Sequence, residues 1–176
     1  MCIRDSANHV GAGPTTDCGT PIPVASLQHF TIVPAQSTAT YKVHENLILG
    51  GVGSNTAVGT THGVQGDLYL RTSPAPLVAK VHITVDLSTL QTDSAQRDNF
   101  VRQNYLQTDQ YPDAVFTSTC VTGLPATYSD GQTITFQMTG NLALHGKVNQ
   151  ETFAVQGQLS GTALTGTATT NIFMTD

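Results

Sequence analysis

The chain has 176 residues, a length that suits a single domain and is sufficient to bury a sizeable hydrophobic core. Charged residues make up 11% of the sequence, far below the roughly 25% that is typical of soluble domains, and the formal net charge is -5. With only seven Lys and Arg residues, the chain has no basic stripe that could neutralise phosphates, so nucleic acid is excluded as an expected partner.

Residues 1–27 are predicted to form a flexible leader. The first six, MCIRDS, show no periodicity and are interpreted as an artefact of the sequence, and the rest is rich in Gly, Pro, Thr and Ala. The leader lacks the charged-then-apolar pattern of a signal peptide. No run in the chain approaches the roughly 18 apolar residues that span a bilayer as a helix, so no transmembrane segment is predicted. The folded domain is expected over residues 28–176.

The glycine-rich segment 50–60, GGVGSNTAVGT, lacks the GxGxxG spacing and the following helix of a phosphate-binding loop. It is interpreted as part of a long hairpin, because segments of this length are often only connections. The functional alternative is a mobile flap near a binding pocket, which the glycines would permit.

Residues 81–87 alternate strictly between apolar and polar, which predicts a strand with one buried face. On its polar face His82 and Asp86 lie four residues apart, about 13 Å along a strand at roughly 3.3 Å per residue. This separation is too great for the two side chains to share a metal ion or a proton. A polar outer surface is therefore the better interpretation.

Residues 93–106 are the one segment with a helical pattern. Asp93 or Ser94 is suited to the N-cap position, and Phe100, Val101 and Leu106 form an irregular apolar face. We therefore predict a single short helix between two strands.

Three later segments again show one-sided apolar alternation. These apolar faces consist of Ile134, Phe136, Met138, Leu142 and Leu144; of Phe153, Val155 and Leu159; and of Leu164, Ala168, Ile172 and Met174. Turn-forming residues at 73–76, 129–131, 145–147 and 160–161 separate the strands, which favours an antiparallel meander. The pattern fits a sandwich and a closed barrel equally well, because both bury one face of every strand.

Cys18 and Cys120 are the only pair considered for a disulfide, which would fasten the leader to the barrel. Two free thiols are the alternative, because a flexible leader does not fix the Cα separation that a disulfide needs. No Cys-x-x-Cys pair or Cys/His cluster indicates structural zinc, so no metal is predicted.

No local signature of an enzyme is present, since the chain lacks a GxSxG elbow or a comparable nucleophile motif. We predict no catalytic residues and no cofactor. An enzyme would require residues such as His44, His62 or Asp86 to converge through the fold.

Residues 87–118 carry the most informative order of motifs. A strand ends around Ser88 and Leu90, Arg97-Asp98 opens the helical connection, and Tyr111-Pro112 leads into a strand with Phe116 and Ser118. In this order the segment resembles the YceI-like family of polyisoprenoid-binding proteins. Residues 30–43 are similar to the first strands of that family, and residues 136–153 to its glycine-then-hairpin region.

Two features depart from this family. Val148-Asn149 follows Gly146-Lys147 where many members carry a Thr-Lys step, and the chain stops at Asp176 where the family usually continues into a closing strand. We therefore expect a C-terminally truncated fragment. An unpaired barrel edge in such a fragment would favour strand addition or a dimer.

The resemblance implies an all-β fold, a lipocalin-like antiparallel β-barrel of about eight strands with one short helix and a long internal pocket. It further implies a periplasmic or extracellular protein that binds a polyisoprenoid or isoprenoid-quinone lipid without catalysing a reaction. Carriage, storage or shielding of the lipid would be its role. A filled-core structural or adhesion module is the first alternative, and an enzyme with its site at the barrel mouth is the second.

The predicted ligand-binding residues combine the inward parity of the strands with this resemblance. They are Val43, Ile83, Val85, Phe100, Leu106, Phe116, Ile134, Phe136, Met138, Leu142, Phe153, Val155, Leu164 and Ile172. Arg97 and Asp98 are candidates for the pocket mouth, where they would meet a lipid head group. Their structural alternative is local pairing at the start of the helix, because an exposed ion pair contributes little else.

Overall fold

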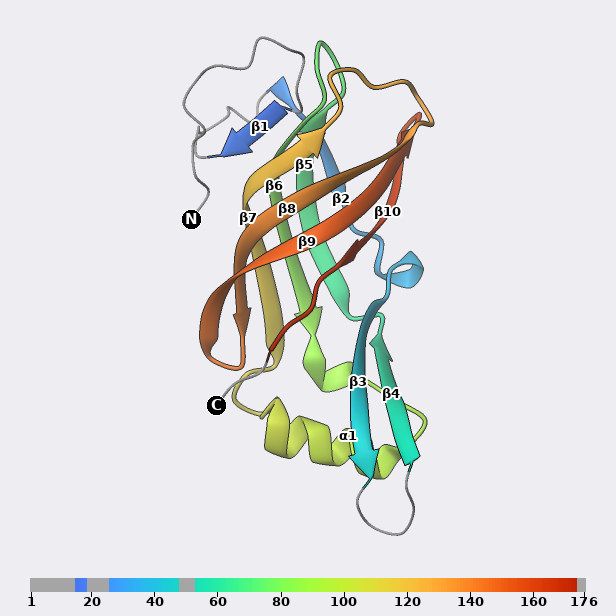
Figure 1. Ribbon diagram of the computed structural model, residues 1–176, viewed down its shortest axis with the longest axis vertical. Helices are drawn as coiled ribbons and strands as arrows, with labels where there is room; N and C mark the ends of the chain where they lie inside the picture. The colour runs from blue at the N-terminus through green and yellow to red at the C-terminus, as the bar shows by residue number, and fades with distance from the viewer. Residues whose placement is uncertain (1–14, 19–25, 48–52, 174–176) are drawn as a thin grey trace.

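The computed structural model describes residues 15–18, 26–47 and 53–173, with the backbone alone described at 15–17, 44–47 and 53–55 (Figure 1). The strands are β1 (Thr15–Cys18), β2 (Gln28–Thr31), β3 (Ala39–Leu47), β4 (Gly53–Thr61), β5 (Val64–Arg71), β6 (Leu77–Asp86), β7 (Asp113–Leu124), β8 (Thr133–Leu144), β9 (Lys147–Ser160) and β10 (Ala163–Thr169). The helical segments are η2 (Pro34–Gln36), η3 (Leu87–Thr89), α1 (Ala95–Phe100) and η4 (Val101–Tyr105), the last being a π-helical turn.

Eight strands form one antiparallel sheet in the order β10-β9-β8-β7-β6-β5-β2, with β1 paired to the end of β7 that β6 does not reach. Figure 1 shows this sheet curled into a half-barrel. Among the described residues no ladder joins β2 to β10, so these strands are its edges. The predicted lipocalin-like antiparallel fold with one short helix is confirmed.

The two longest strands of the sheet show why the alternation in the sequence specifies this fold. Across the ladder between β8 and β9, Met138 is opposite Phe153 and Phe136 is opposite Val155, so large apolar side chains lie side by side. Residues at the intervening positions along each strand, such as Ala154 of β9, are exposed on the other face of the sheet. Each strand therefore contributes one apolar face to the concave side of the sheet.

The predicted helix is confirmed, and it begins at its expected N-cap. The Oγ of Ser94 accepts a hydrogen bond from the backbone N–H of Arg97 at 3.4 Å. A small apolar cluster lies between the helix and the sheet, and its buried members are Leu87, Leu90 and Leu106. The helix thereby covers one end of the half-barrel (Figure 1). None of the helices in the described part of the chain is long and apolar enough to cross a membrane.

The glycine-rich segment forms part of a hairpin, as the first interpretation predicted. Residues 53–61 are β4, which pairs with β3 in a separate two-stranded sheet. Tyr41 of β3 packs over Gly59 of β4, where a Cβ atom would overlap the tyrosine ring. The flap alternative concerns residues 50–52 as well, and these lie outside the described residues.

Cys18 and Cys120, the pair considered from the sequence, form a disulfide, and the free-thiol alternative is wrong for these two residues. The pairing follows from strand register, because Cys18 lies directly opposite Cys120 in the ladder between β1 and β7, with a Cα–Cα distance of 4.4 Å. Within the predicted leader, β1 is therefore attached to the sheet. Residues 1–14 and 19–25 lie outside the described residues.

Candidate ligand-binding site

A continuous apolar surface lines the inside of the half-barrel, and we call it the concave apolar face. Its buried members are Val81, Phe116, Val121, Leu124, Met138 and Leu142. The half-buried residues packed against them are Leu68, Val78, Ile83, Ile134, Phe136, Leu144, Phe153 and Val155. Burial decreases from β7 toward β9, so the part of the face nearest the β10 edge keeps apolar surface in contact with solvent.

Two glycines shape the face in different ways. Gly140 lies under the ring of Phe116, where a Cβ atom would be only 2.6 Å from Cζ. Without that side chain the phenylalanine can lie flat on β8 and meet Phe153 edge-on, with ring centroids 4.8 Å apart. At Gly157, by contrast, the nearest atom to an added Cβ is 3.9 Å away, so room remains beside Phe136.

The structure brings most of the predicted ligand-binding residues together. Those on the concave apolar face are Ile83, Phe116, Ile134, Phe136, Met138, Leu142, Phe153 and Val155. Val85 and Leu106 belong to the cluster beneath the helix, and Leu164 is half-buried on β10. Their assignment as ligand contacts stays a prediction.

Three predicted ligand-binding residues are not members of this face and are about half exposed, although Ile172 lines a small hollow together with Leu142 of the face. Val43 is 49% exposed, Phe100 is 54% exposed and Ile172 is 41% exposed. Phe100 makes its ring contact with Tyr105 on the helix, at a centroid distance of 5.6 Å.

Sequence reasoning missed Val121, which is among the most buried members of the face. A register shift between Ser118 and Cys120 interrupts the alternation of β7, so Val121, at an odd position, lies on the same face as Phe116, at an even position.

Arg97 and Asp98 make contacts with their own segment. The buried carboxylate of Asp98 accepts hydrogen bonds from the backbone N–H of Thr92 at 2.9 Å and from its hydroxyl at 2.7 Å. Arg97 donates to the exposed carboxylate of Asp93 at 2.6 Å. Both side chains thus pair locally at the start of the helix, which was the structural alternative. Their assignment to the pocket mouth stays a prediction.

The residues considered for an enzyme have local partners. Asp86 accepts from the backbone N–H of Ser88 at 2.9 Å, and the Nδ1 of His62 lies 2.8 Å from the carbonyl oxygen of Ser37. The side chain of His44 lies outside the described residues. In the part of the chain that the structure describes, no group of three or more His, Cys, Asp or Glu residues is placed to hold a metal ion.

Two hollows lie near β9, and they differ in character. The larger, of about 610 Å³, is on the outer face and is lined by Gln137, Gln150, Glu151, Thr152, Ala154, Thr169, Thr170 and Asn171. Its polar lining does not suit a lipid tail. The smaller, of about 40 Å³, lies beside the turn between β8 and β9 and is lined by Leu142, Leu144, His145, Lys147, Asn149, Glu151, Ile172 and Phe173.

Comparison with known proteins decides the family. Residues 30–176 match the model of the YceI-like domain, a range that includes β3 to β10 and the helix but not β1. The chain belongs to the YceI-like family.

Relatives with the same domain share part of the sequence. Protein YceI of Shigella flexneri is 36% identical over 72 residues, which are 40% of this chain and 34% of that protein. UPF0312 protein plu2095 of Photorhabdus laumondii is also 36% identical over 72 residues, or 33% of that protein. Each match thus spans about a third of the relative's length.

Two solved structures share the fold at low identity. Burkholderia cenocepacia BcnA has a TM-score of 0.58 at 16% identity, covering 78% of this chain and 77% of that one. A polyisoprenoid binding domain from Saccharophagus degradans, implicated in plant cell wall breakdown, has a TM-score of 0.54 at 15% identity, covering 78% of this chain and 71% of that one. At these identities the likeness concerns the fold alone.

Proposed function

We propose that this YceI-like chain binds a polyisoprenoid or similar long-chain lipid non-covalently on the concave apolar face, and that it catalyses no reaction. The observation that carries the proposal is the half-buried apolar surface of Phe136, Phe153 and Val155, which continues the buried core toward solvent. Contiguous apolar surface that reaches solvent can mark a site for a ligand or a partner.

A polyisoprenoid tail suits such a surface for a simple energetic reason. Each methylene group that leaves water contributes roughly 0.8 kcal/mol, and the tail requires no hydrogen bonds along its length. Affinity would therefore increase with the length of tail that the face covers. Binding without chemistry is compatible with carriage, storage or shielding of the lipid.

The lipid class and the compartment belong to the same proposal. An isoprenoid quinone combines a tail of this kind with a neutral head group, and the structural neighbour from Saccharophagus degradans is described as a polyisoprenoid binding domain. The disulfide between Cys18 and Cys120 supports an oxidising compartment, the periplasm or the extracellular space. The exposed strand β10 offers backbone groups through which a second copy could pair.

A pair of substitutions on adjacent residues of β9 tests the proposal. Val155 is half-buried on the concave apolar face, and Ala154 is exposed on the outer face. We expect Val155→Glu to reduce the lipid that co-purifies from a bacterial host more than about tenfold, because an unpaired carboxylate would lie in the path of the tail.

Ala154→Glu introduces the same charge on the outer face and is the matched control, for which unchanged lipid content is expected. Lipid is quantified by organic extraction and mass spectrometry per mole of folded protein. Equal retention by the two folded variants would show that the tail does not lie on the concave apolar face.

A filled-core structural module is the second candidate, and one observation favours it. Phe116 and Phe153 meet edge-on inside the half-barrel, as expected where side chains fill the interior. In that case neither substitution would alter lipid content, because there would be no specific lipid to lose.

A further inference from the structure

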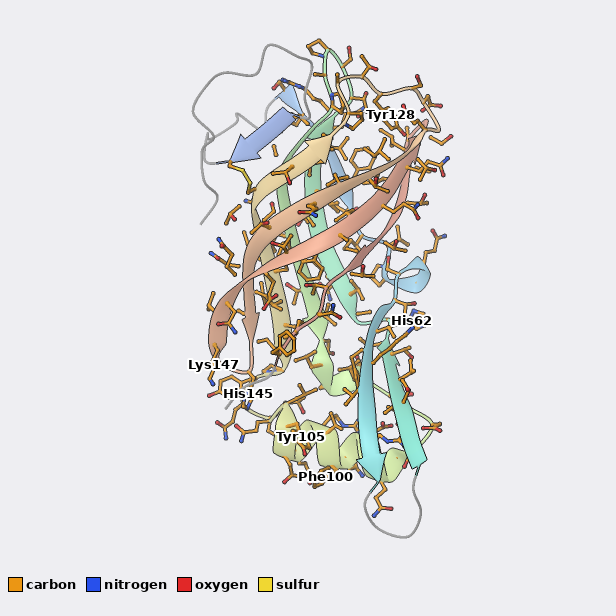
Figure 2. All side chains as sticks on the ribbon, in the orientation of Figure 1. His62, Phe100, Tyr105, Tyr128, His145 and Lys147 are labelled. Carbon is orange, nitrogen blue, oxygen red and sulfur yellow. A yellow bond between two sulfur atoms is a disulfide. The ribbon has the colours of Figure 1, made fainter. Side chains whose placement is uncertain are left out.

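Large apolar side chains are exposed together at one end of the half-barrel, which we call the helical end. Figure 2 shows this end through the labels of Phe100 and Tyr105 on the helix and of His145 and Lys147 at the turn between β8 and β9. The smaller hollow, beside that turn, is also lined by residues of the segment after β10. Apolar side chains gathered in this way can mark an interaction surface. The exposed apolar residues of the helical end are Phe100, Tyr105, Val148, Ile172 and Phe173.

A π-helical turn brings the two aromatic rings of this end together. At about 100° per residue, side chains five positions apart on a regular α-helix point in directions roughly 140° apart. In η4 the backbone N–H of Leu106 donates to the carbonyl oxygen of Val101 at 2.9 Å, a hydrogen bond that spans five residues. Residues five apart therefore share a side of the turn. Val101 and Leu106 face the apolar cluster beneath the helix, whereas Phe100 and Tyr105 meet edge-on and are 54% and 59% exposed.

The opposite end of the half-barrel has a different surface. Its described turns, residues 72–76, 125–132 and 160–162, contain no exposed large apolar side chain. The tyrosine of that end, Tyr128, is half-buried and bound into the fold. Its hydroxyl donates to the carbonyl oxygen of Leu159 at 2.6 Å and accepts from the N–H of the same residue at 2.7 Å. The exposed aromatic pair is therefore a property of the helical end, and π-helical turns are frequent at functional sites.

The helical end is continuous with the concave apolar face. Leu144 packs against the buried cluster of that face and also against the cluster beneath the helix. The same residue lines the smaller hollow together with Ile172 and with Phe173, which is 84% exposed. Apolar surface therefore extends from the interior of the half-barrel to the exposed side chains of this end.

The spread and the charge of these side chains favour a lipid bilayer as the occupant. They belong to a helical turn, a hairpin and the segment after β10, so they form separate projections. A protein partner requires one complementary contour, whereas a fluid bilayer interface accepts separate apolar projections. The amphipathic ring of a tyrosine suits such an interface. Residues 93–113, which include the helix, carry two Arg and four Asp, a balance that does not suit an anionic surface.

We propose that the helical end docks on a neutral phospholipid bilayer, with its exposed apolar side chains entering the interface between head groups and acyl chains. This inference rests on the proposed function, because a lipid that binds on the concave apolar face has to come from a membrane. Docking at this end would let the tail pass from the bilayer to the face without crossing water, which long apolar chains strongly avoid.

Two valines provide a matched pair of substitutions for the test. Val148, at the helical end, is 65% exposed, and Val33, in the connection between β2 and β3, is 52% exposed. We expect Val148→Asp to weaken binding of the full chain to phosphatidylcholine vesicles about tenfold, because a carboxylate resists entry into the interface. Val33→Asp should bind as the wild type does. Vesicle flotation measures all three proteins, and equal binding by them would overturn the inference.

A second measurement uses the absence of tryptophan from the sequence. Tyr105→Trp places a single fluorophore at the helical end, and its emission should move to shorter wavelength when phosphatidylcholine vesicles are added. Val33→Trp should show no such shift. Stronger binding to vesicles that contain anionic phosphatidylglycerol would overturn the neutral bilayer. A shift that needs no vesicles and grows with protein concentration would assign the surface to a second copy of the chain, and would overturn the bilayer altogether.

Vesicle binding and lipid content are measured independently, so this inference and the proposed function fail separately. Val155→Glu, the variant expected to lose lipid from the concave apolar face, should still bind vesicles, because Val155 does not belong to the helical end. A chain that retains lipid but binds no vesicles would overturn the docking inference and leave the proposed function standing. A folded wild type that binds vesicles but retains no lipid would support docking and overturn the proposed function.

Discussion

Gly140 and Gly157 lie on the concave side of neighbouring strands, and the space around them differs sharply. An added Cβ at Gly140 would overlap the carbonyl oxygen of Thr117 and lie 2.6 Å from the ring of Phe116. At Gly157 the same atom would have only ordinary contacts at 3.9 Å. The first glycine is therefore required by packing, and the second leaves an open position on the face.

The two glycines should therefore respond differently to substitution by alanine. We expect Gly140→Ala to lower the free energy of unfolding by about 1–3 kcal/mol, because overpacking forces the ring or the strand to move. Gly157→Ala is expected to change it by less than about 0.5 kcal/mol. Urea denaturation followed by circular dichroism measures both, and equal effects would contradict the packing described for Phe116.

At the scale of elements, alternation predicts some strand faces and fails at others. The inward positions of β8 and β9 follow from the sequence because their ladder is regular. β7 contains a register shift between Ser118 and Cys120, so a single parity could not find both Phe116 and Val121. The N-cap of α1 was predictable from Ser94, but the change to a π-helical turn after Phe100 has no signal in helix propensities.

A disulfide attaches β1 to the sheet, and its contribution to the free energy of unfolding can be measured. The disulfide between Cys18 and Cys120 closes a segment with a sequence separation of 102. Loop-closure entropy for such a segment amounts to about 2–5 kcal/mol, so Cys18→Ser should lower the free energy of unfolding by that order.

Cys2→Ser serves as the control for this experiment, because Cys2 has no part in the Cys18–Cys120 bond. The two variants and the wild type are compared by urea denaturation without reductant. The same stability for Cys18→Ser and the wild type would show that β1 adds nothing to the folded domain.

At the scale of the whole molecule, periodicity alone left the choice between a sandwich and a barrel open. The resemblance in residues 87–118 resolved that choice, and the curled sheet agrees with it. Curl accumulates from strand twist and register shifts, neither of which is visible in a pattern of apolar residues. For the same reason the exposed positions of Val43 and Phe100 could not be anticipated, because each depends on how a hairpin or helix meets the sheet.

Native mass spectrometry of the unmodified chain, purified from a bacterial host and combined with organic extraction, tests the central claim most directly. The account predicts a discrete co-purifying mass of an isoprenoid lipid, or a gain of one such mass when an isoprenoid quinone is added to empty protein. A folded chain that remains empty and gains no mass with added quinone would contradict the account, and the filled-core module would then be the better description.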